Sequence, residues 1–454
     1  MTKNRETFGS RFAVIMTFAG SAIGLGNIWR FPYLAGEGGG AAFVLLYLIF
    51  TLLFSLPIFM VESIIGRRSG ANCMGAVKKL APGRAWQLLG ALSVITPLVI
   101  VSYYSVVGGW SFEFFLKSCG LAFTGCDPES VKDLFPAFTS SFWGPSLCFT
   151  AFLALSCLIV ASGVKKGIEK FSKYSIPVLF LMMILIMVYS LSLDGAGAGV
   201  RYLVKPDFSK LSLPVCASAL GQSFYSLSLG MGIIITYSSY VDKKENLLAS
   251  GSWTAFFDAA FALMAGFAIM PAVFTAGIEP SSGPGLIFQT LPFIFAKMGI
   301  DLPVVSAAAA ILFFLCICIS ALTSSVSLIE VGVAYLVEEK GLRRGTAALT
   351  VFAGTWVAGM LCSLSIGPLS GLAVMEKPLF DLLDIFSSNF LLLFGSVMAV
   401  LLVGWKMSRE DVWDEFTNSG SLRTNVRIFR PLYFIIKYVT PLALVAIFIS
   451  NFIF

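Results

Sequence analysis

Long apolar segments alternate with short polar ones along the whole chain. Eleven segments of roughly 20 to 35 residues are apolar enough to cross a bilayer, for which about 20 residues suffice. Apolar and polar positions do not alternate within them as they do in barrel strands, and backbone groups in lipid must be satisfied internally, so we predict helices. The predicted spans are 11–35, 41–66, 85–118, 143–162, 168–193, 213–241, 250–276, 302–337, 346–366, 379–405 and 429–453.

Composition supports a membrane protein. Hydrophobic residues make up 57% of the 454 residues and charged residues only 12%, whereas a soluble domain carries roughly a quarter charged residues. The net charge of +6 would suit nucleic acid, but the basic residues lie in short segments between spans, so we expect no nucleic-acid partner. The chain has no histidine, which removes the usual proton carrier at neutral pH and the commonest metal ligand.

The basic residues also predict the orientation. With the N-terminus in the cytoplasm, 22 of the 31 lysines and arginines fall on the cytoplasmic side. Eleven spans then place the C-terminus outside. The basic N-terminus and first apolar stretch are similar to a signal peptide, but no convincing small-residue cleavage site follows, so we predict a retained first helix. Cys119 and Cys126 bracket a loop on the outer side, where either a disulfide or two free thiols are compatible with the sequence.

Two spans are interrupted by glycines in related surroundings. The first carries SAIGLGN at 21–27, and the sixth, five spans later, carries SLSLGMG at 226–232. Paired interruptions predict discontinuous helices in two inverted repeats around a central site. Close helix packing on glycines is the alternative, and the matching positions favour the site. We therefore predict a first repeat in 1–193, a second in 213–405 and an eleventh helix in 429–454.

The motifs at these interruptions resemble the signature of the neurotransmitter:sodium symporter family, in its bacterial amino-acid transporter branch. They are GSAIGLGNIWRFPY at 20–33, GGGA at 38–41, SLSLG at 226–230 and SALTSS at 320–325. The resemblance extends from Arg5 to the last span. It implies an all-α leucine-transporter fold in the bacterial inner membrane, in which spans 1, 2, 6 and 7 move against spans 3, 4, 8 and 9. It implies no organic cofactor and no obligate protein partner.

The resemblance also implies two sodium sites, for which unwound backbone supplies free carbonyl oxygens. The first would use the Ala22 carbonyl, Asn27, Ser226 and Asp258, with the substrate carboxylate completing it. The second would use the carbonyls of Gly20, Ile23 and Ser320 and the hydroxyls of Thr323 and Ser324. Hydroxyls of serine and threonine in helices also bond to carbonyls of their own helix, which is the alternative for Thr323 and Ser324.

Asp258 is an ionisable residue inside a span, which makes it a functional candidate. Many relatives have Asn at this position and need chloride nearby. Tyr47, Gln222 and Ser226 match the chloride-site positions, but the remaining serine position is Ala262. A fixed carboxylate at Asp258 would replace the anion, so we predict chloride independence. The alternative is a protonated, merely hydrogen-bonded Asp258.

The substrate is expected where the two interruptions meet, because free N–H groups at helix N-termini suit a carboxylate. The resemblance assigns the carboxylate to the N–H groups of Leu25 and Gly26 and the Tyr104 hydroxyl. It assigns the ammonium group to the carbonyls of Ala22, Tyr225 and Ser226 and the Ser228 hydroxyl. The side-chain pocket would be formed by Ile100, Tyr225, Met231, Ser324 and Leu328, an apolar set that favours hydrophobic amino acids.

The resemblance assigns gates to two pairs of charged residues. Arg30 and Asp384 match the outer pair, while Arg5 and Glu338 match the inner one, with Glu in place of Asp. Such residues near helix ends can also be simple interfacial anchors. Glu62 in the second span matches a buried carboxylate beside the sixth span, where it would satisfy freed backbone groups.

The function implied is sodium-coupled symport of hydrophobic L-amino acids, aliphatic or aromatic, by alternating access. A proton-driven transporter of the same architecture is one rival, with Asp258 or Glu62 as the proton carrier. A sensor that binds an amino acid without moving it is the other. An enzyme is not expected, because the sequence offers no nucleophile–base pair, metal cluster or phosphate loop. The preferred amino acid and the oligomeric state stay open.

Overall fold

The computed structural model describes residues 6–277, 286–371 and 377–453, with side chains up to Ile449. Arg5 of the predicted inner gate therefore lies outside the described residues. Among the described residues, nine helices are long and apolar enough to cross a membrane. These nine match nine of the predicted spans to within two helical turns. They are Ala41–Ser69, Arg84–Cys119, Trp143–Ala161, Val164–Leu191, Leu247–Thr275, Pro303–Lys340, Arg344–Ile366, Leu379–Lys406 and Arg423–Ile449.

The two remaining predicted spans are broken. The first consists of α1 (Arg11–Ala22), followed by η1 (Gly26–Arg30) and α2 (Phe31–Glu37), and it bends by 59°. The sixth consists of α12 (Leu213–Ser226) and α13 (Ile233–Ser238), separated by turns. Counting the bent pair as one span gives ten spans among the described residues. The two halves of the sixth predicted span, with 14 and 6 residues, are each too short to cross a membrane alone.

The breaks have local causes. Ile23 leaves the helix with φ −71° and ψ 108°, so the chain is extended directly after α1. In the sixth span, Gly230 and Gly232 have φ of 75° and 70°, a left-handed backbone that glycine adopts without steric cost. Gly24, Gly230 and Gly232 therefore lie in the breaks, whereas Gly26 begins η1.

The remaining elements extend, cap or bend these spans. The second span consists of α3 (Ala41–Phe50), η2 (Thr51–Ser55) and α4 (Leu56–Ser69), and the tenth of α18 (Leu379–Phe386), η6 (Ser387–Leu391), α19 (Leu392–Leu401) and η7 (Leu402–Lys406). The last consists of α21 (Arg423–Phe434), η8 (Ile435–Val439) and α22 (Thr440–Ile453). The other long spans are α6 (Arg84–Cys119), α9 (Trp143–Ala161), η3 (Val164–Glu169) with α10 (Lys170–Leu191), α14 (Leu247–Thr275), α16 (Pro303–Lys340) and α17 (Arg344–Ile366). Short helices between spans are α5 (Cys73–Leu80), α7 (Pro128–Lys132), α8 (Leu134–Ser140), α11 (Gly197–Val204), η4 (Phe208–Lys210), η5 (Leu286–Thr290), α15 (Leu291–Met298) and α20 (Arg409–Thr417).

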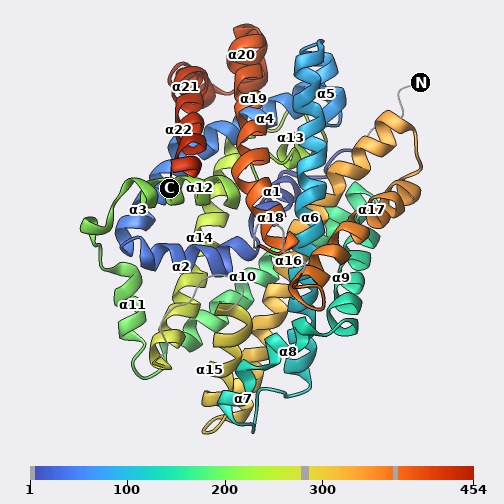
Figure 1. Cartoon of the computed structure of the whole chain (residues 1–454). Helices are drawn as coiled ribbons and strands as arrows, with labels where there is room; N and C mark the ends of the chain where they lie inside the picture. The colour runs from blue at the N-terminus through green and yellow to red at the C-terminus, as the bar shows by residue number, and fades with distance from the viewer. Residues whose placement is uncertain (1–5, 278–285, 372–376, 454) are drawn as a thin grey trace.

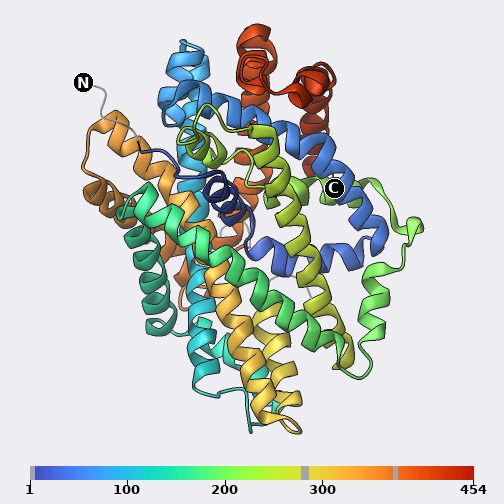
Figure 2. The same cartoon turned by 180° about the vertical axis from the view of Figure 1, so that it is seen from behind.

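The short helices lie at the two ends of the bundle (Figures 1 and 2). α5, α20 and α21 lie at the same end as the N-terminus, whereas α7, α8 and α15 lie at the opposite end. α1 runs through the middle of the bundle in both views, and α6 packs extensively along α16. This arrangement surrounds the break in the first span with helices.

The polarity of the bundle fits a lipid surrounding. Large apolar side chains such as Leu52, Leu158 and Leu442 are exposed, at 64%, 65% and 71%. Serine and threonine side chains are buried inside, where other polar groups satisfy many of them. At the end of α6 and in the loop that follows it, Cys119 and Cys126 are both free thiols in the structure, so the disulfide alternative is not formed.

Candidate functional site

The two helix breaks meet at the centre of the bundle. Ser228, in the turn that follows α12, donates a hydrogen bond from its hydroxyl to the carbonyl oxygen of Ser21 in α1, 2.7 Å away. Ser228 has φ of 55°, a conformation that costs a residue other than glycine about 1 to 3 kcal/mol and that concentrates at functional sites. The strained turn of one break is thus tied directly to the other.

A small cavity of about 30 Å³ lies at this meeting point. The eleven residues expected to bind the substrate all line it, and they come from α1, α6, α12, α16 and the two breaks. They are Ala22, Leu25, Gly26, Ile100, Tyr104, Tyr225, Ser226, Ser228, Met231, Ser324 and Leu328. Ser21, Gly24, Asn27 and Ile233 complete the lining and were not among the expected substrate residues.

One wall of the cavity presents donors near a glycine. The backbone N–H of Leu25 donates to the Tyr104 hydroxyl over 3.4 Å, so the groups expected to hold a carboxylate are neighbours. A Cβ atom at Gly24 would lie 2.8 Å from the Ser324 hydroxyl oxygen, closer than real Cβ contacts. A side chain at position 24 would therefore enter the cavity and displace Ser324.

Asp258 is fully buried beside this cavity and is surrounded by uncharged donors. Its carboxylate accepts hydrogen bonds from Asn27 Nδ2 at 2.7 Å, from the Ser226 hydroxyl at 2.7 and 2.8 Å, and from the Tyr47 hydroxyl at 2.9 Å. Gln222, another expected chloride-site position, donates instead to the Gly26 carbonyl over 3.4 Å. The carboxylate thus takes up hydrogen bonds from two of the expected chloride-site side chains.

The residues of the first expected sodium site form one cluster. Asn27 and Ser226 contact each other at 3.1 Å and both contact Asp258, while Ala22 lines the same cavity. The Asn27 amide oxygen accepts from the Gly24 N–H, so its nitrogen faces the carboxylate. A half-turn of the amide would present its oxygen to a sodium ion, and hard cations prefer such oxygen ligands.

The second expected sodium site is brought together in part. The Ser324 hydroxyl donates to the Ile23 carbonyl over 3.2 Å, which joins α16 to the break after α1. The Thr323 hydroxyl donates to the Ser320 carbonyl over 2.9 Å, within its own helix. Gly20 lies against Ser172 of α10. Thr323 therefore follows the helix-bonding alternative in this conformation, whereas Ser324 reaches across to the other helix.

The residues predicted to form the two gates differ in what they contact. Among the described residues, no ion pair joins Arg30 to Asp384. The Arg30 guanidinium lies over the Tyr225 ring instead, 5.2 Å from its centroid. At the end of the bundle that holds the N-terminus, α5 and α20, called the inner end from here on, Glu338 accepts hydrogen bonds from the backbone and side chain of Asn72, at 2.8 and 3.0 Å.

Glu62 satisfies a freed backbone group, as predicted. One of its carboxylate oxygens accepts a 2.6 Å hydrogen bond from the N–H of Gly230, in the break of the sixth span.

A second cavity, of about 400 Å³, lies next to the central one. Tyr225 lines both cavities, and Arg30, Asn389 and Ser396 also line the second. Sequence reasoning did not predict this second cavity, because its polar residues belong to separate helices.

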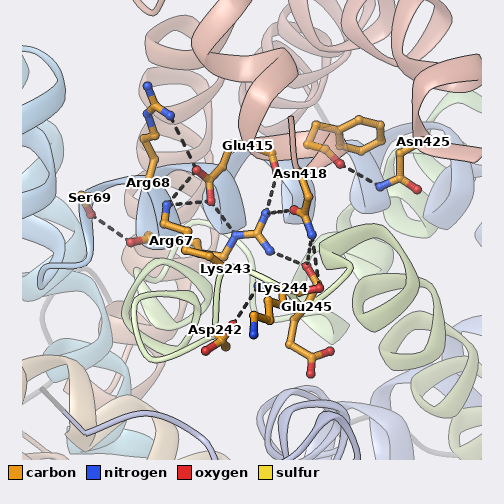
Figure 3. Close-up of polar contacts among 12 residues, drawn as sticks. Arg67, Arg68, Ser69, Asp242, Lys243, Lys244, Glu245, Glu415, Asn418 and Asn425 are labelled. Carbon is orange, nitrogen blue, oxygen red and sulfur yellow. Dashed lines mark hydrogen bonds and ion pairs between the residues drawn. The ribbon is translucent and has the colours of Figure 1, made fainter. Parts of the chain in front are cut away.

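Sequence reasoning also missed two buried ion-pair clusters at the inner end. Glu330, which the sequence left unassigned, accepts hydrogen bonds from Arg344 and from the Tyr240 hydroxyl. Glu415 in α20 accepts from Arg67 of α4 at 2.5 Å and from Lys243 at 2.9 and 3.1 Å (Figure 3). Nothing in the sequence pairs residues more than 170 positions apart, so only the folded chain reveals the second cluster.

Comparison with known proteins assigns the family. The model of the sodium:neurotransmitter symporter family matches residues 5–134 and 140–454, almost the entire chain. The chain belongs to this family. It is therefore a sodium-dependent membrane transporter and not an enzyme, as the sequence predicted.

The similarity to individual relatives extends over nearly the whole length of both chains. An uncharacterised sodium-dependent transporter of Bacillus subtilis, YhdH, is 35% identical over 444 residues, which cover 98% of this chain and 97% of that protein. A similarly described protein of Haemophilus influenzae is 34% identical over 461 residues, covering 99% and 98%. The crystal structure of MhsT in complex with L-phenylalanine is 36% identical, with a TM-score of 0.89 over 99% of this chain and 100% of that one. The leucine-transporter type of fold follows from this match.

Proposed function

We propose that the protein carries hydrophobic L-amino acids into the cell together with sodium, without a need for chloride. One observation supports this above all others. Asn27 and Ser226 line the central cavity and at the same time bond to the buried carboxylate of Asp258. Sodium bound at Asp258 would share ligands with the substrate cavity, so that ion and substrate would stabilise each other there.

The substrate class is inferred from the cavity wall. Ile100, Met231 and Leu328 offer apolar surface, and Tyr225 adds an aromatic ring. Met231 has a flexible side chain that adapts to different shapes. MhsT, 36% identical, was solved with L-phenylalanine bound, which supports an aromatic or aliphatic amino acid here. Because the cavity of about 30 Å³ is small, a bound side chain of this size requires the surrounding side chains to move outward.

Two sodium ions would provide the driving force. We assign one to Ala22, Asn27, Ser226 and Asp258, and the other to Gly20, Ile23, Ser320, Thr323 and Ser324. A tenfold gradient is worth about 1.4 kcal/mol per ion, and 100 mV adds about 2.3 kcal/mol per charge. Two ions then supply about 7 kcal/mol, enough for roughly 10⁵-fold accumulation of a zwitterion.

The proposed architecture has eleven membrane helices. We infer that residues 1–193 and 213–405 form two inverted repeats and that 429–454 adds the eleventh helix, with the N-terminus in the cytoplasm and the C-terminus outside. The bacterial relatives support a place in the inner membrane. Arg30 with Asp384 would close the outer path, and Arg5 with Glu338 the inner one.

Uptake into proteoliposomes tests this function. Labelled leucine, tyrosine and tryptophan are each offered with an inward sodium gradient, with potassium in place of sodium, and with gluconate in place of chloride. We expect accumulation that requires sodium and is unchanged without chloride. Accumulation driven equally by a pH gradient without sodium would overturn the sodium sites in favour of proton coupling. Binding without accumulation would identify a sensor.

A further inference from the structure

The beginning of the last span carries an exposed row of arginines. Arg423, Arg427 and Arg430 in α21 are four and three residues apart, so they lie on one face of the helix, over about 10 Å of its length. All three are exposed. The helix RTNVRIFRPLYF contains no acidic residue, and the ion pairs among the described residues all use other basic side chains.

The same face continues into an apolar surface. Phe434, Tyr438 and Val445 follow the arginines at helical spacing and are 57%, 45% and 45% exposed. A side chain such as Phe434 is exposed on a membrane helix because lipid covers it. Arginines on the same face, at the end of the apolar surface, therefore lie close to the lipid headgroups.

An aromatic cluster surrounds Tyr438, one helical turn after Phe434 on this face. The Trp405 indole N–H donates to the Lys437 carbonyl over 3.0 Å, and the Trp405 and Tyr438 rings lie 5.7 Å apart. The Lys437 ammonium lies 4.8 Å from the centre of the Trp405 ring. Exposed tryptophan and tyrosine beside lysine are typical of the boundary between hydrocarbon and headgroups.

The opposite face of α21 is fixed to the protein. Asn425 is buried and donates to the Phe416 carbonyl of α20 over 2.7 Å (Figure 3), and Phe429 is also buried. α20 is in turn joined to α4 by the ion pair of Glu415 with Arg67. The arginines therefore extend from a helix that is held in place, so little ordering is needed when they bind a ligand.

We propose that Arg423, Arg427 and Arg430 form a binding surface for the phosphate groups of anionic phospholipids. A guanidinium group binds a phosphate through two parallel hydrogen bonds, which a lysine cannot do. Three arginines that form no ion pair with the described residues are complementary in charge to a negatively charged leaflet, and each contributes roughly a fivefold gain in affinity at moderate salt. The surface does not depend on which amino acid is carried.

The chain provides a matched control. Lys166, Lys170 and Lys173 in η3 and α10 have the same spacing of four and three residues and are also exposed. They differ in having ammonium groups and an acidic neighbour, Glu169, in the same turns. A general attraction of basic residues to the membrane would act on both rows alike.

Titration of the purified full-length protein with phosphatidylglycerol in detergent micelles tests the proposal. Thermal stabilisation is the readout, and phosphatidylcholine is the uncharged reference lipid. We compare R423Q/R427Q/R430Q with K166Q/K170Q/K173Q. The arginine variant should need at least tenfold more phosphatidylglycerol for half-maximal stabilisation, and the lysine variant less than threefold more. The variant R423K/R427K/R430K, which keeps all charges, should need at least threefold more and guards against a loss of folding in the glutamine variant.

Three results would overturn the proposal. Equal weakening in the arginine and lysine variants would indicate general electrostatics, and an unchanged arginine variant would remove the surface altogether. Protection by inorganic phosphate alone, at constant ionic strength, would identify a site for free phosphate instead of lipid. Because lipid binding is measured without transport, a failure here leaves the proposed function untouched, and the reverse also holds.

Discussion

Two buried carboxylates, Asp258 at the centre of the bundle and Glu415 at its inner end, differ in the side chains that surround them. Asp258 is 0% exposed, and the partners of its side chain are Asn27, Ser226 and Tyr47, all uncharged. Glu415 is 4% exposed as a residue and forms ion pairs with Arg67 and Lys243 (Figure 3). Both carboxylates are removed from water, but only Glu415 has fixed positive charges beside it.

The difference distinguishes a structural ion-pair cluster from a proposed ion-binding site. The cluster of Glu415 with Arg67 and Lys243 is called the fastening below. A buried charge is costly unless an opposite charge or several good hydrogen bonds compensate it. At Glu415 the protein supplies the cation permanently, so the cluster joins α4, α20 and the segment after α13. Glu330, paired with Arg344, belongs to the same class. At Asp258 the side-chain partners carry no charge, which leaves the carboxylate free to bind the sodium ion that we propose for this position.

Breaking the fastening should have the largest effect on stability. In Arg67→Ala, the buried Glu415 loses its closest cation, and loss of one partner of a buried ion pair costs about 3 to 5 kcal/mol. Arg67 also donates to the carbonyls of Glu245 and Glu415, which would lose these bonds. Denaturant unfolding in detergent measures the change in the free energy of unfolding.

Arg68→Ala is the control for this variant. Arg68 is next in sequence, but its side chain is 34% exposed: it pairs with the exposed Asp411 and reaches Glu415 only over 4.0 Å. Pairs of this kind are worth at most about 1 kcal/mol. Equal losses in Arg68→Ala and Arg67→Ala would show that the burial of the Glu415 cluster has no special role.

Neutralising the central carboxylate should affect sodium instead of stability. Asp258→Asn keeps the size of the side chain and removes its charge, so sodium loses its anionic ligand. We expect the sodium concentration for half-maximal uptake to rise about 100-fold, equivalent to about 3 kcal/mol. Glu415→Gln is the comparison: it should lower stability and leave the sodium dependence within twofold. A normal sodium dependence in Asp258→Asn would disprove the ion site.

The sequence predicted the central site better than the inner fastening, for a physical reason. The breaks at 21–27 and 226–232 have local causes, because glycine lowers the stability of a helix only within a few residues of its own position. The residues around them, including Asp258, could be placed through family motifs. Glu415 and Arg67 are 348 positions apart, and neither belongs to such a motif. The pairing depends on how α20 folds back onto α4.

The span count shows a related limit. Apolar length predicted the spans, but it could not show that α12 and α13 are too short and separate to count as one continuous helix. The conformation of the gates was also beyond the sequence. Arg30 lies over Tyr225 in this structure and forms no ion pair with Asp384, because a long side chain with several rotatable bonds can reach more than one partner.

A chloride ion should partly replace the missing carboxylate. In Asp258→Asn the negative charge is absent, while Tyr47 and Ser226 keep the hydroxyls that bonded to it. Adding Ala262→Ser supplies the remaining hydroxyl expected at a chloride site. We expect uptake by the double variant to increase about tenfold when chloride replaces gluconate, whereas the unaltered protein should not respond. Lack of a chloride response in the double variant, with folding intact, would show that Asp258 does more than supply a charge.

The smallest effect should come from the exposed edge of the fastening, where two neighbouring lysines differ in one contact. The Lys243 ammonium bonds to both oxygens of Glu415, at 2.9 and 3.1 Å, but its side chain is 62% exposed. Water and salt weaken such a pair, so Lys243→Gln should cost less than about 1 kcal/mol of stability and less still at high salt. Lys244→Gln removes the same charge one residue further on, and no ion pair among the described residues uses Lys244. A salt-dependent loss in Lys243→Gln alone would place the edge of the fastening at that lysine. Identical behaviour of the two variants would mean that the arginines, with Arg67 at 2.5 Å and Arg68 at 4.0 Å, hold Glu415 without help from Lys243.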